Sequence, residues 1–399
     1  MKIAMMVRGF MPTPVPEGVA YSPASVAQSV AEGLQGLGHD VTFYGTEKTT
    51  LDVERIETCG QRSIVNSQLE FEEFTSSADL FKNYLPSLYD MRLSREMLEA
   101  AARGEYDCVI FNHFESALPL AKLFPDVPIV YILHDYIDES RRQMMEMYTS
   151  PNQHFISISD NQRRDAPDLN YAATIYNGIN TDYFNFEPDA EDYLMFSGRI
   201  TPIKGVKEAV QVAVQSKSRL LIAGTLSKVD YWYFDEHIKP YLDDRILFLG
   251  MLDKEQLRKY YQKAAGLLMP IQWEEPFGLS MVEANACGTP VIAFNRGSVP
   301  EIVVNGKNGF VVDNSAEMIM AIKKLKTVSR RSCRDRVVRN YTTARMVKHY
   351  ETTLLEICHK QAGRVSTAKS ASRNTQVRAS LKRISSRLKM KNRAHPTKK

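Results

Sequence analysis

Short apolar runs alternate with amphipathic helical stretches along most of the chain, and this alternation constrains the fold more than any other feature. Strand, helix and strand in succession favour a parallel sheet built from right-handed crossover units. The predicted strands are too many for one comfortable sheet, and 399 residues suffice for two domains with separate cores. We therefore expect an α/β protein with two Rossmann-like parallel-sheet domains that face each other. The predicted strands are Lys2–Val7, Val41–Tyr44, Cys108–Phe111, Ile129–Leu133, His154–Ile158, Tyr193–Phe196, Leu220–Ala223, Ile246–Leu249, Leu267–Pro270 and Pro290–Phe294.

Helical patterns fall between these runs, at Ala24–Leu37, Val206–Ser216, Lys254–Ala264 and Ala316–Leu325 among others. A polar, acidic stretch from Thr181 to Asp192 separates the two groups of strands. The sequence thus predicts a first domain over residues 1–182 and a second over 183–340. A helix follows over about 341–360, and a basic tail covers 361–399.

Two carboxylates, Glu275 and Glu283, stand eight residues apart across the expected start of a helix. Eight helical steps of about 100° leave the second about 80° around from the first, so both are expected to look into one cleft. Between them, the backbone N–H groups of Phe277, Gly278 and Leu279 lie at a helix N-terminus, where an anion is favoured. Their neighbour Glu274 is expected to face solvent or to support Glu275.

A basic pair, Arg199 and Lys204, follows the strand predicted at Tyr193–Phe196. Arginine offers a planar fork for bidentate phosphate contacts, and lysine offers a mobile point charge. In parallel sheets, ligands bind at the carboxyl ends of the strands. The loops that begin at Arg199, Gly224, Gly250 and Gln272 all follow predicted strands, and we expect them to converge.

These segments resemble a known family. The stretch Glu274–Glu283 resembles the E-x7-E signature of the retaining glycosyltransferases of family 4 (glycosyl transferases group 1), which have the GT-B fold. Ser197–Gly205 resembles the basic diphosphate-binding segment of that family, and Ile175–Asn180 resembles the Asn-Gly segment that ends its first domain. The segments keep the order and rough spacing of the family, and the similarity runs from Met1 to about Lys360.

The resemblance implies an enzyme that moves a sugar, expected to be a hexose, from a nucleotide-diphosphate sugar to a glycan, lipid or small-molecule acceptor. Glu275 is expected to accept hydrogen bonds from the donor sugar, and Glu283 from the ribose. Retention of configuration is implied by the family likeness alone. The residues assigned to the reaction are His113, Arg199, Lys204 and Glu275. Those assigned to the donor are Gly18, Arg199, Lys204, Gly224, Leu249, Gly250, Glu275, Phe277, Gly278, Leu279, Ser280 and Glu283.

In the first domain, His113 follows the strand predicted at Cys108–Phe111. The family carries a histidine there, near the anomeric carbon of the donor, so the resemblance makes His113 the candidate for the reaction centre. His134 is a second candidate, which could instead shape the acceptor pocket or cap a strand. Family members often carry a Gly-Gly pair in their first loop, whereas this chain has Gly18 followed by Val19, which restricts the backbone more.

Transfer from a nucleotide sugar places negative charge on the departing diphosphate, which a metal or fixed cations must stabilise. The sequence has no strict Asp-x-Asp pair, so Arg199 and Lys204 are expected to take this part without a metal or other cofactor. Two other functions stay open: an epimerase or phosphorylase of related fold, and a sugar-nucleotide-binding scaffold without catalysis. A dehydrogenase is disfavoured, because Gly33–Gly38 ends a predicted helix and does not follow a strand.

The five cysteines are scattered without metal-ligand spacing, and no apolar run is long enough to cross a membrane. A cytoplasmic location is expected. From Lys360 onward the chain has thirteen Lys or Arg and no Asp or Glu, so the +4 net charge hides an acidic body. This tail is expected to be disordered, or to lie on the inner face of an anionic membrane through Leu381, Ile384 and Leu388. Specific nucleic-acid binding is not expected, because basic charge alone carries no sequence recognition.

Overall fold

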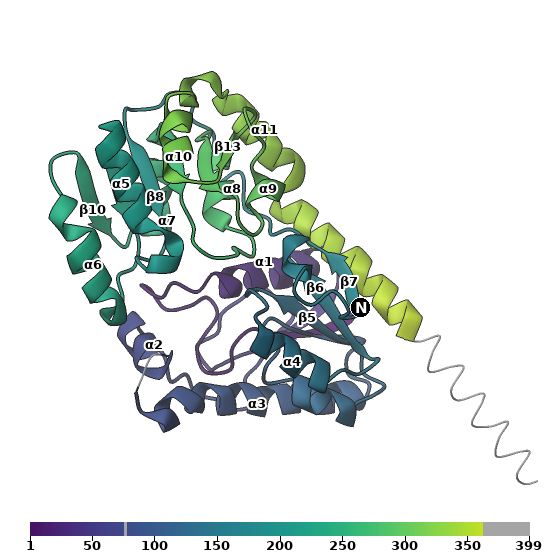
Figure 1. The fold of residues 1–399 in the computed structure, drawn as a ribbon. Helices are drawn as coiled ribbons and strands as arrows, with labels where there is room; N and C mark the ends of the chain where they lie inside the picture. The colour runs from purple at the N-terminus through teal and green to yellow at the C-terminus, as the bar shows by residue number, and fades with distance from the viewer. Residues whose placement is uncertain (76–77, 362–399) are drawn as a thin grey trace, which may run out of the picture.

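The computed structural model describes residues 1–75 and 78–361, which form two α/β units joined side by side (Figure 1). The first unit has a seven-stranded sheet in the order β3-β2-β1-β4-β5-β6-β7, and the second a six-stranded sheet in the order β10-β9-β8-β11-β12-β13. All paired strands are parallel. The predicted fold class, two parallel-sheet Rossmann-like domains, is confirmed.

The strands of the first sheet are β1 (Lys2–Met6), β2 (Asp40–Tyr44), β3 (Arg55–Glu57), β4 (Cys108–Phe111), β5 (Ile129–Leu133), β6 (Gln153–Ser157) and β7 (Tyr171–Thr174). Its helices are α1 (Ser22–Gly36), α2 (Gln68–Thr75), α3 (Leu80–Ala102) and α4 (Glu139–Met147), with 3-10 turns η1 (Leu118–Leu123) and η2 (Asn161–Arg163).

The second sheet comprises β8 (Leu194–Ser197), β9 (Leu220–Ala223), β10 (Ile246–Gly250), β11 (Gly266–Met269), β12 (Val291–Phe294) and β13 (Gly309–Val312). Its helices are α5 (Val206–Ser216), α6 (Tyr231–His237), α7 (Lys254–Lys263), α8 (Leu279–Ala286), α9 (Val299–Ile302), α10 (Ser315–Ile322) and α11 (Arg330–Asn340). Short 3-10 turns are η3 (Pro202–Lys204), η4 (Lys228–Asp230), η5 (Lys239–Tyr241) and η6 (Leu325–Thr327).

Every strand predicted from an apolar run is present within one residue at each end, but the predicted number is too low because β3, β7 and β13 were missed. All three are edge strands. An edge strand has one neighbour and less burial, so it needs no long apolar run to be stable. β3, for example, has charged residues at both ends.

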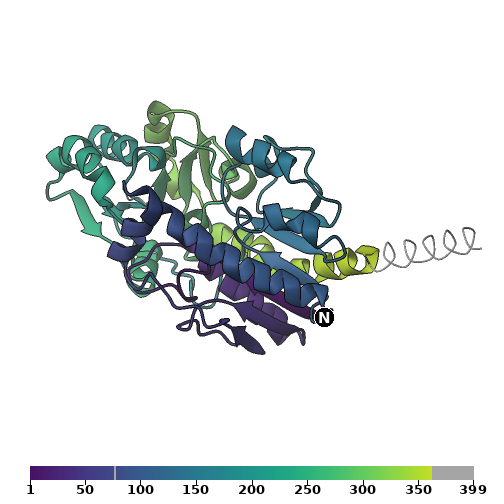
Figure 2. The same ribbon diagram turned by 90° about the horizontal axis from the view of Figure 1, so that it is seen from below.

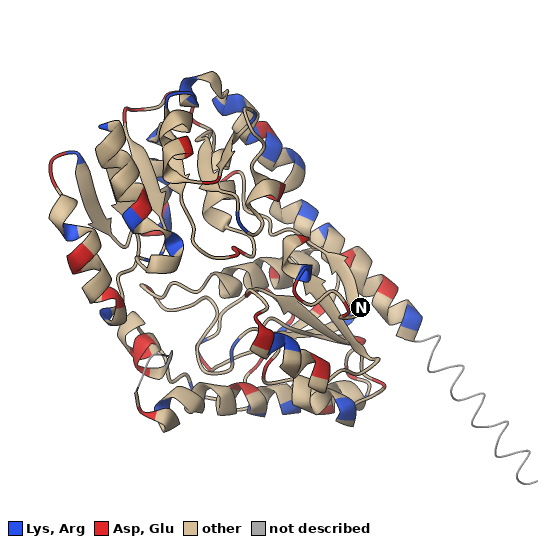
Figure 3. Cartoon of the chain, viewed as in Figure 1, with Lys and Arg blue, Asp and Glu red and all other residues tan. Residues whose placement is uncertain are grey.

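Successive side chains of the central strands point to opposite faces of the sheet and so enter two different hydrophobic cores. Ile3 and Met5 of β1 belong to one hydrophobic cluster, whereas Ala4 and Met6 belong to another on the opposite face. Figure 3 shows the consequence, because charged residues lie on helices and loops while the strands are nearly free of them.

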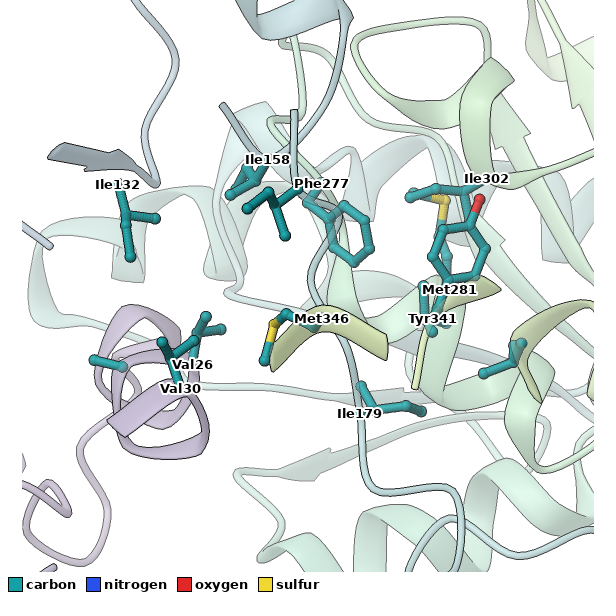
Figure 4. Packing of buried hydrophobic residues seen from close by; sticks show 14 of the residues in the cluster. Val26, Val30, Ile132, Ile158, Ile179, Phe277, Met281, Ile302, Tyr341 and Met346 are labelled. Carbon is teal, nitrogen blue, oxygen red and sulfur yellow. The ribbon is translucent and has the colours of Figure 1, made fainter. Parts of the chain in front are cut away.

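One hydrophobic cluster passes through both units (Figure 4). It contains Val30 of α1 in the first unit, Met281 of α8 in the second, and Leu354 of the C-terminal helix, residues 343–361. That helix follows the second unit in sequence yet packs on the first: Val347 touches Gly33, and Glu351 lies 3.3 Å from His39. Figures 1 and 2 show it running along one side of the molecule.

Candidate functional site

Both sheets reverse their winding direction at one point, between β1 and β4 in the first and between β8 and β11 in the second. The carboxyl ends of strands at such a point leave a crevice where ligands bind in open α/β sheets. The loops that follow these four strands carry Arg8, His113, Arg199 to Lys204, and Gln272 to Gly278. The candidate site is therefore built on two switch points.

The two carboxyl edges face each other. The turn after β6 contacts the loop after β11, where Asn161 Nδ2 lies 3.5 Å from Glu274 Oε2. Burial and Asp165 raise the pKa of Tyr136, which follows β5, and Glu274 adds a smaller effect of the same direction. Side chains from both sheets can thus reach one ligand.

Strand ends in the second unit are joined by short backbone bonds. The N–H of Gly198 donates to Ala223 at 3.1 Å, and the N–H of Gly224 donates to Gly250 at 2.8 Å. A Cβ on Gly224 would lie 1.7 Å from the Gly198 carbonyl oxygen, so only glycine fits there. Gly250 has φ of 71°, while Leu249 packs partly buried against the core. The predicted convergence of the loops after β8, β9 and β10 is thus seen.

Lys204 and Glu275, which the sequence assigned separately to the donor, contact each other. Lys204 Nζ lies 2.5 Å from Glu275 Oε2. Trp273 Nε1 donates to the same oxygen at 2.9 Å, and Lys204 Nζ lies 4.7 Å from the centre of the indole. The side chains of the pair are 17% and 9% exposed, so water screens them little.

Trp273 was missed in the sequence. Its position two residues before Glu275 was the available signal, because an indole beside a carboxylate can both donate a hydrogen bond and stack against a cation. Arg199, in contrast, is exposed, and its side chain makes no hydrogen bond or ion pair within residues 1–75 and 78–361. Burial raises the pKa of the carboxyl of Asp230, and the positive charge of Arg199 opposes this rise.

The loop after β11 ends at Gly278, which has φ of 80° and precedes α8. No side chain caps this helix, so its first N–H groups, on Leu279 and Ser280, are left without a side-chain acceptor in the described residues. The helical-rotation argument for Glu275 and Glu283 is wrong, however, because α8 starts only at Leu279. Pro276 and the left-handed Gly278 keep Glu275 in the loop.

Glu283 lies in the middle of α8 with its carboxyl half-buried. Burial raises its pKa to about 7, against a weak opposing effect of Lys254. No hydrogen bond or ion pair to this carboxyl is found in the described part of the chain. A ligand with hydroxyl donors would supply what this group lacks.

Two other donor-assigned residues direct their side chains elsewhere. The ring of Phe277 is buried among Tyr176 and Tyr341, at 6.2 and 6.0 Å between centres. Ser280 Oγ donates to Met269 Sδ at 3.6 Å. Phe277 can therefore offer only its backbone to a ligand, whereas the hydroxyl proton of Ser280 is directed into the protein.

In the first unit, His113 sits within a cluster of charged side chains. Its Nδ1 lies 3.1 Å from Glu115 Oε2 and 4.0 Å from Asp90 Oδ2. Asp90 is fully buried and accepts from Arg8 at 2.8 Å and from the N–H of Gly9 at 2.5 Å. Burial, with Arg8 and Arg141 nearby, holds the pKa of His113 well below its usual value. His113 is therefore a neutral imidazole at physiological pH.

His134 lies beside this cluster, and its Nε2 is 2.9 Å from Asn112 Oδ1. Burial lowers its pKa to about 4. Gly18 has φ of 83° in a turn closed by the Val19 N–H and the Pro16 carbonyl, with Gln68 as its neighbour. Within residues 1–75 and 78–361, no interaction joins Gly18 to Lys204 or Glu275.

Two further kinds of site are absent from the described residues. No cluster of three or more His, Cys, Asp or Glu could hold a metal ion there. None of the helices in that part of the chain combines the length and apolar character that a membrane span needs. The tail predicted to be disordered or membrane-bound lies outside the described residues.

Two family models match successive parts of the chain. Residues 24–183 match the model described as Glycosyltransferase Family 4, and residues 181–345 match that of the Glycosyl transferases group 1. Among curated proteins, a D-inositol 3-phosphate glycosyltransferase of Mycolicibacterium smegmatis is 36% identical over 131 residues, covering 32% of this chain and 30% of its own. The matches span 30–44% of the length of the first curated relatives.

Solved structures match over nearly the whole chain. A sucrose-phosphate synthase from Thermosynechococcus elongatus has a TM-score of 0.66 and 19% identity, over 92% of this chain and 100% of its own. Anabaena HepE in complex with UDP has a TM-score of 0.66 and 16% identity, over 89% and 100%. With two parallel-sheet domains, this likeness gives the chain the GT-B fold.

Proposed function

Because its two halves match glycosyltransferase family 4 and glycosyl transferases group 1 on one GT-B fold, we propose that this chain is a glycosyltransferase that uses a nucleotide-diphosphate sugar. A sugar, expected to be a hexose, passes to an acceptor in glycan or cell-envelope synthesis. Anabaena HepE, a neighbour in fold, has been solved in complex with UDP and with UDP-glucose, which supports the proposal.

The single observation that carries the proposal is the pair of Lys204 and Glu275 at the switch point. These opposite charges lie 2.5 Å apart. A bound donor offers each a better-matched partner: its diphosphate accepts from Lys204, and its sugar hydroxyls donate to Glu275. Trp273 holds the carboxylate in place during this exchange.

The leaving diphosphate gains negative charge as the bond to the anomeric carbon breaks. Lys204, the exposed guanidinium of Arg199 and the uncapped N-terminus of α8 can stabilise that charge together. Fixed groups of this kind need no reorganisation at the moment of reaction. The half-buried carboxyl of Glu283 would accept from the ribose hydroxyls.

We further propose that the reaction retains the configuration at the anomeric carbon and needs no metal ion or other cofactor. In this scheme the leaving phosphate helps to deprotonate the acceptor on the same face of the sugar. His113, kept neutral by its buried surroundings, lies on the first unit, where it would contact the sugar. A cytoplasmic location, with contact of the tail to the inner membrane face, also remains part of the proposal.

A screen of UDP-, GDP- and ADP-sugars for protection against thermal unfolding tests donor binding. A donor at ~100 times its dissociation constant adds about 2.7 kcal/mol of stability.

Product analysis with the stabilising donor then tests transfer, and EDTA is expected to leave the rate unchanged. Donor binding that survives in His113→Ala while transfer is lost supports an enzyme. Binding without transfer to any acceptor in the unmodified protein would favour a scaffold.

A further inference from the structure

A carboxylate of the second unit caps a turn of the first. Glu301, on α9, accepts from the backbone N–H of Asp160 through Oε2 and of Asn161 through Oε1, each at 2.9 Å. The hydroxyl of Tyr176 donates to Oε2 at 2.9 Å. These two N–H groups begin the turn η2, where a negative charge is favoured. One side chain thus fixes the first unit to the second by three hydrogen bonds.

A second carboxylate, Glu274, meets the same turn. Its Oε2 lies 3.5 Å from Asn161 Nδ2, 3.4 Å from Arg164 Nη1 and 2.9 Å from the N–H of Gly297. Glu274 directly precedes Glu275, so the loop that carries the proposed sugar-binding carboxylate is itself part of this contact.

The backbone of the loop is fixed to the segment that leads to Glu301. Ser298 donates through its N–H to the Glu275 carbonyl at 2.9 Å and through Oγ to the Phe277 carbonyl at 2.8 Å. A Cβ on Gly297 would lie 2.3 Å from the backbone N and O of Glu275. A shift of α9 would therefore displace Glu275.

Aromatic packing closes the same contact (Figure 4). Phe277 of the loop lies against Tyr341, where the chain turns back toward the first unit. Tyr176 packs on both rings, at 6.2 and 5.7 Å between centres, while its hydroxyl reaches Glu301. Tyr176 therefore takes part in both the aromatic packing and the hydrogen bonds of this contact.

We propose that Glu301 and Glu274 are positioning residues, which set the loop that carries Glu275 against the first unit and so align the two halves of the reaction centre. His113 and Glu275 lie in different units, and no interaction joins them directly in the described residues. Their relative placement depends on contacts between the units, and these two carboxylates, with the aromatic group, provide them next to the loop.

Hydrogen exchange of Glu301→Gln tests the coupling without relying on any activity. The amide keeps the shape of the side chain but offers one acceptor in place of two and turns donors toward the Asp160 and Asn161 N–H groups. Exchange at residues 160–161 is expected to rise by about tenfold or more, the effect of a lost hydrogen bond to a charged group. It is also expected to rise at residues 274–278 and 297–298.

The control is Asp235→Asn, which removes one charge from the exposed pair of Asp235 on α6 and Lys239 on η5. It should leave all of these segments unchanged. Tyr176→Phe, which removes one of three hydrogen bonds and keeps the ring, should give a smaller rise. Faster exchange confined to residues 160–161 in Glu301→Gln would overturn the coupling.

Kinetic measurements on the same variants test the alignment, and this test rests on the proposed function. Arg199, Lys204 and Glu283, the proposed contacts of the diphosphate and the ribose, lie in the second unit outside the displaced loop, so the dissociation constant of the nucleoside diphosphate of the stabilising donor should change less than threefold in Glu301→Gln and Glu274→Gln. The kcat should fall by about 10- to 100-fold, as expected for groups misplaced by about 1 Å. Equal losses in affinity and kcat would contradict alignment. If the wild type shows no transfer, the proposed function fails, while the exchange result still decides the coupling.

Discussion

At the scale of single residues, buried charged groups of the site lie in oppositely charged pairs. Lys204 lies against Glu275, and Arg8 lies against the buried Asp90. Unpaired buried charges would cost several kcal/mol each, so pairing offsets this cost and still presents charged groups near a ligand. Glu283 is the exception, because its burial is met by a shifted pKa and not by a partner.

Replacing Lys204 tests the cation on which the proposed mechanism depends. Lys204→Ala is expected to lower kcat by 10²–10³-fold, about 2.7–4 kcal/mol, by analogy with the loss of one oxyanion donor. Lys204→Arg should restore part of the rate, because it keeps the charge. Steady-state kinetics with the identified donor measures both, and Lys239→Ala, at an exposed pair, is the control. An unchanged kcat in Lys204→Ala would exclude this residue from the mechanism.

Glu283 predicts a particular dependence of stability on pH. The folded state holds this proton up to about pH 7, whereas the unfolded chain loses it near its ordinary value of 4.5. Between these values the folded state binds more protons, so the free energy of unfolding falls as pH rises, by at most about 3–4 kcal/mol for this group. Urea unfolding at pH 5 and pH 8 should show a smaller fall in Glu283→Gln than in the wild type. Parallel pH profiles would show that the carboxyl is not desolvated.

At the scale of elements, glycines decide where the binding loops turn. Gly205 ends η3 with φ of 75° and starts α5, and its missing Cβ leaves room for the Pro270 carbonyl. Gly278 similarly starts α8 in the left-handed region. Through these turns the loops after β8 and β11 approach closely enough for Lys204 to reach Glu275. The strands supply the frame, and the glycines set the distance between the loops.

A matched pair of glycine variants separates backbone strain from steric overlap. Gly250→Ala puts a Cβ at φ of 71° with nothing within 4 Å, so it should cost about 1–2 kcal/mol. Gly205→Ala has a similar φ of 75°, but its Cβ would lie 1.8 Å from the Pro270 oxygen. Overlap should add about 1–3 kcal/mol or more. Denaturant unfolding of both variants measures the difference, and equal losses would mean that the loops relax freely.

At the scale of the whole molecule, the two units share a core. The hydrophobic cluster that contains Val30, Met281 and Leu354 joins α1, α8 and the C-terminal helix. A helix that follows the second unit in sequence thereby completes the first. Together with the cap by Glu301, this arrangement makes the orientation of the units a property of packing and not of a short linker.

Shortening one side chain of that helix tests the shared core. Leu354→Ala should lower the free energy of unfolding by about 2–5 kcal/mol, since the leucine is fully buried. Both tryptophans, Trp232 and Trp273, lie in the second unit and report on it by fluorescence, whereas circular dichroism follows both units. We expect both midpoints to fall together. Met320→Ala, at a residue that is 53% exposed, should change little. A fluorescence midpoint that stays in place would show that the units unfold independently.

The sequence predicted the fold because its information is local. Apolar runs marked every central strand to within one residue, and α5 was predicted at its observed bounds. Edge strands such as β3 were missed, since their weaker burial leaves a weaker pattern. Of the candidate site, the order of loops after strands could be read directly, whereas the rotation argument for Glu275 and Glu283 failed at the break before α8.

By itself, the sequence determined two parallel sheets and the residue types that lie at their carboxyl edges. Only the tertiary structure decided which of those residues meet: Lys204 with Glu275 and Trp273, and Glu301 with the turn that begins at Asn161. Strand and helix patterns arise from neighbours a few residues apart, which the sequence states. Contacts between residues 71 or 140 positions apart depend on how whole sheets and helices pack, which no local pattern encodes.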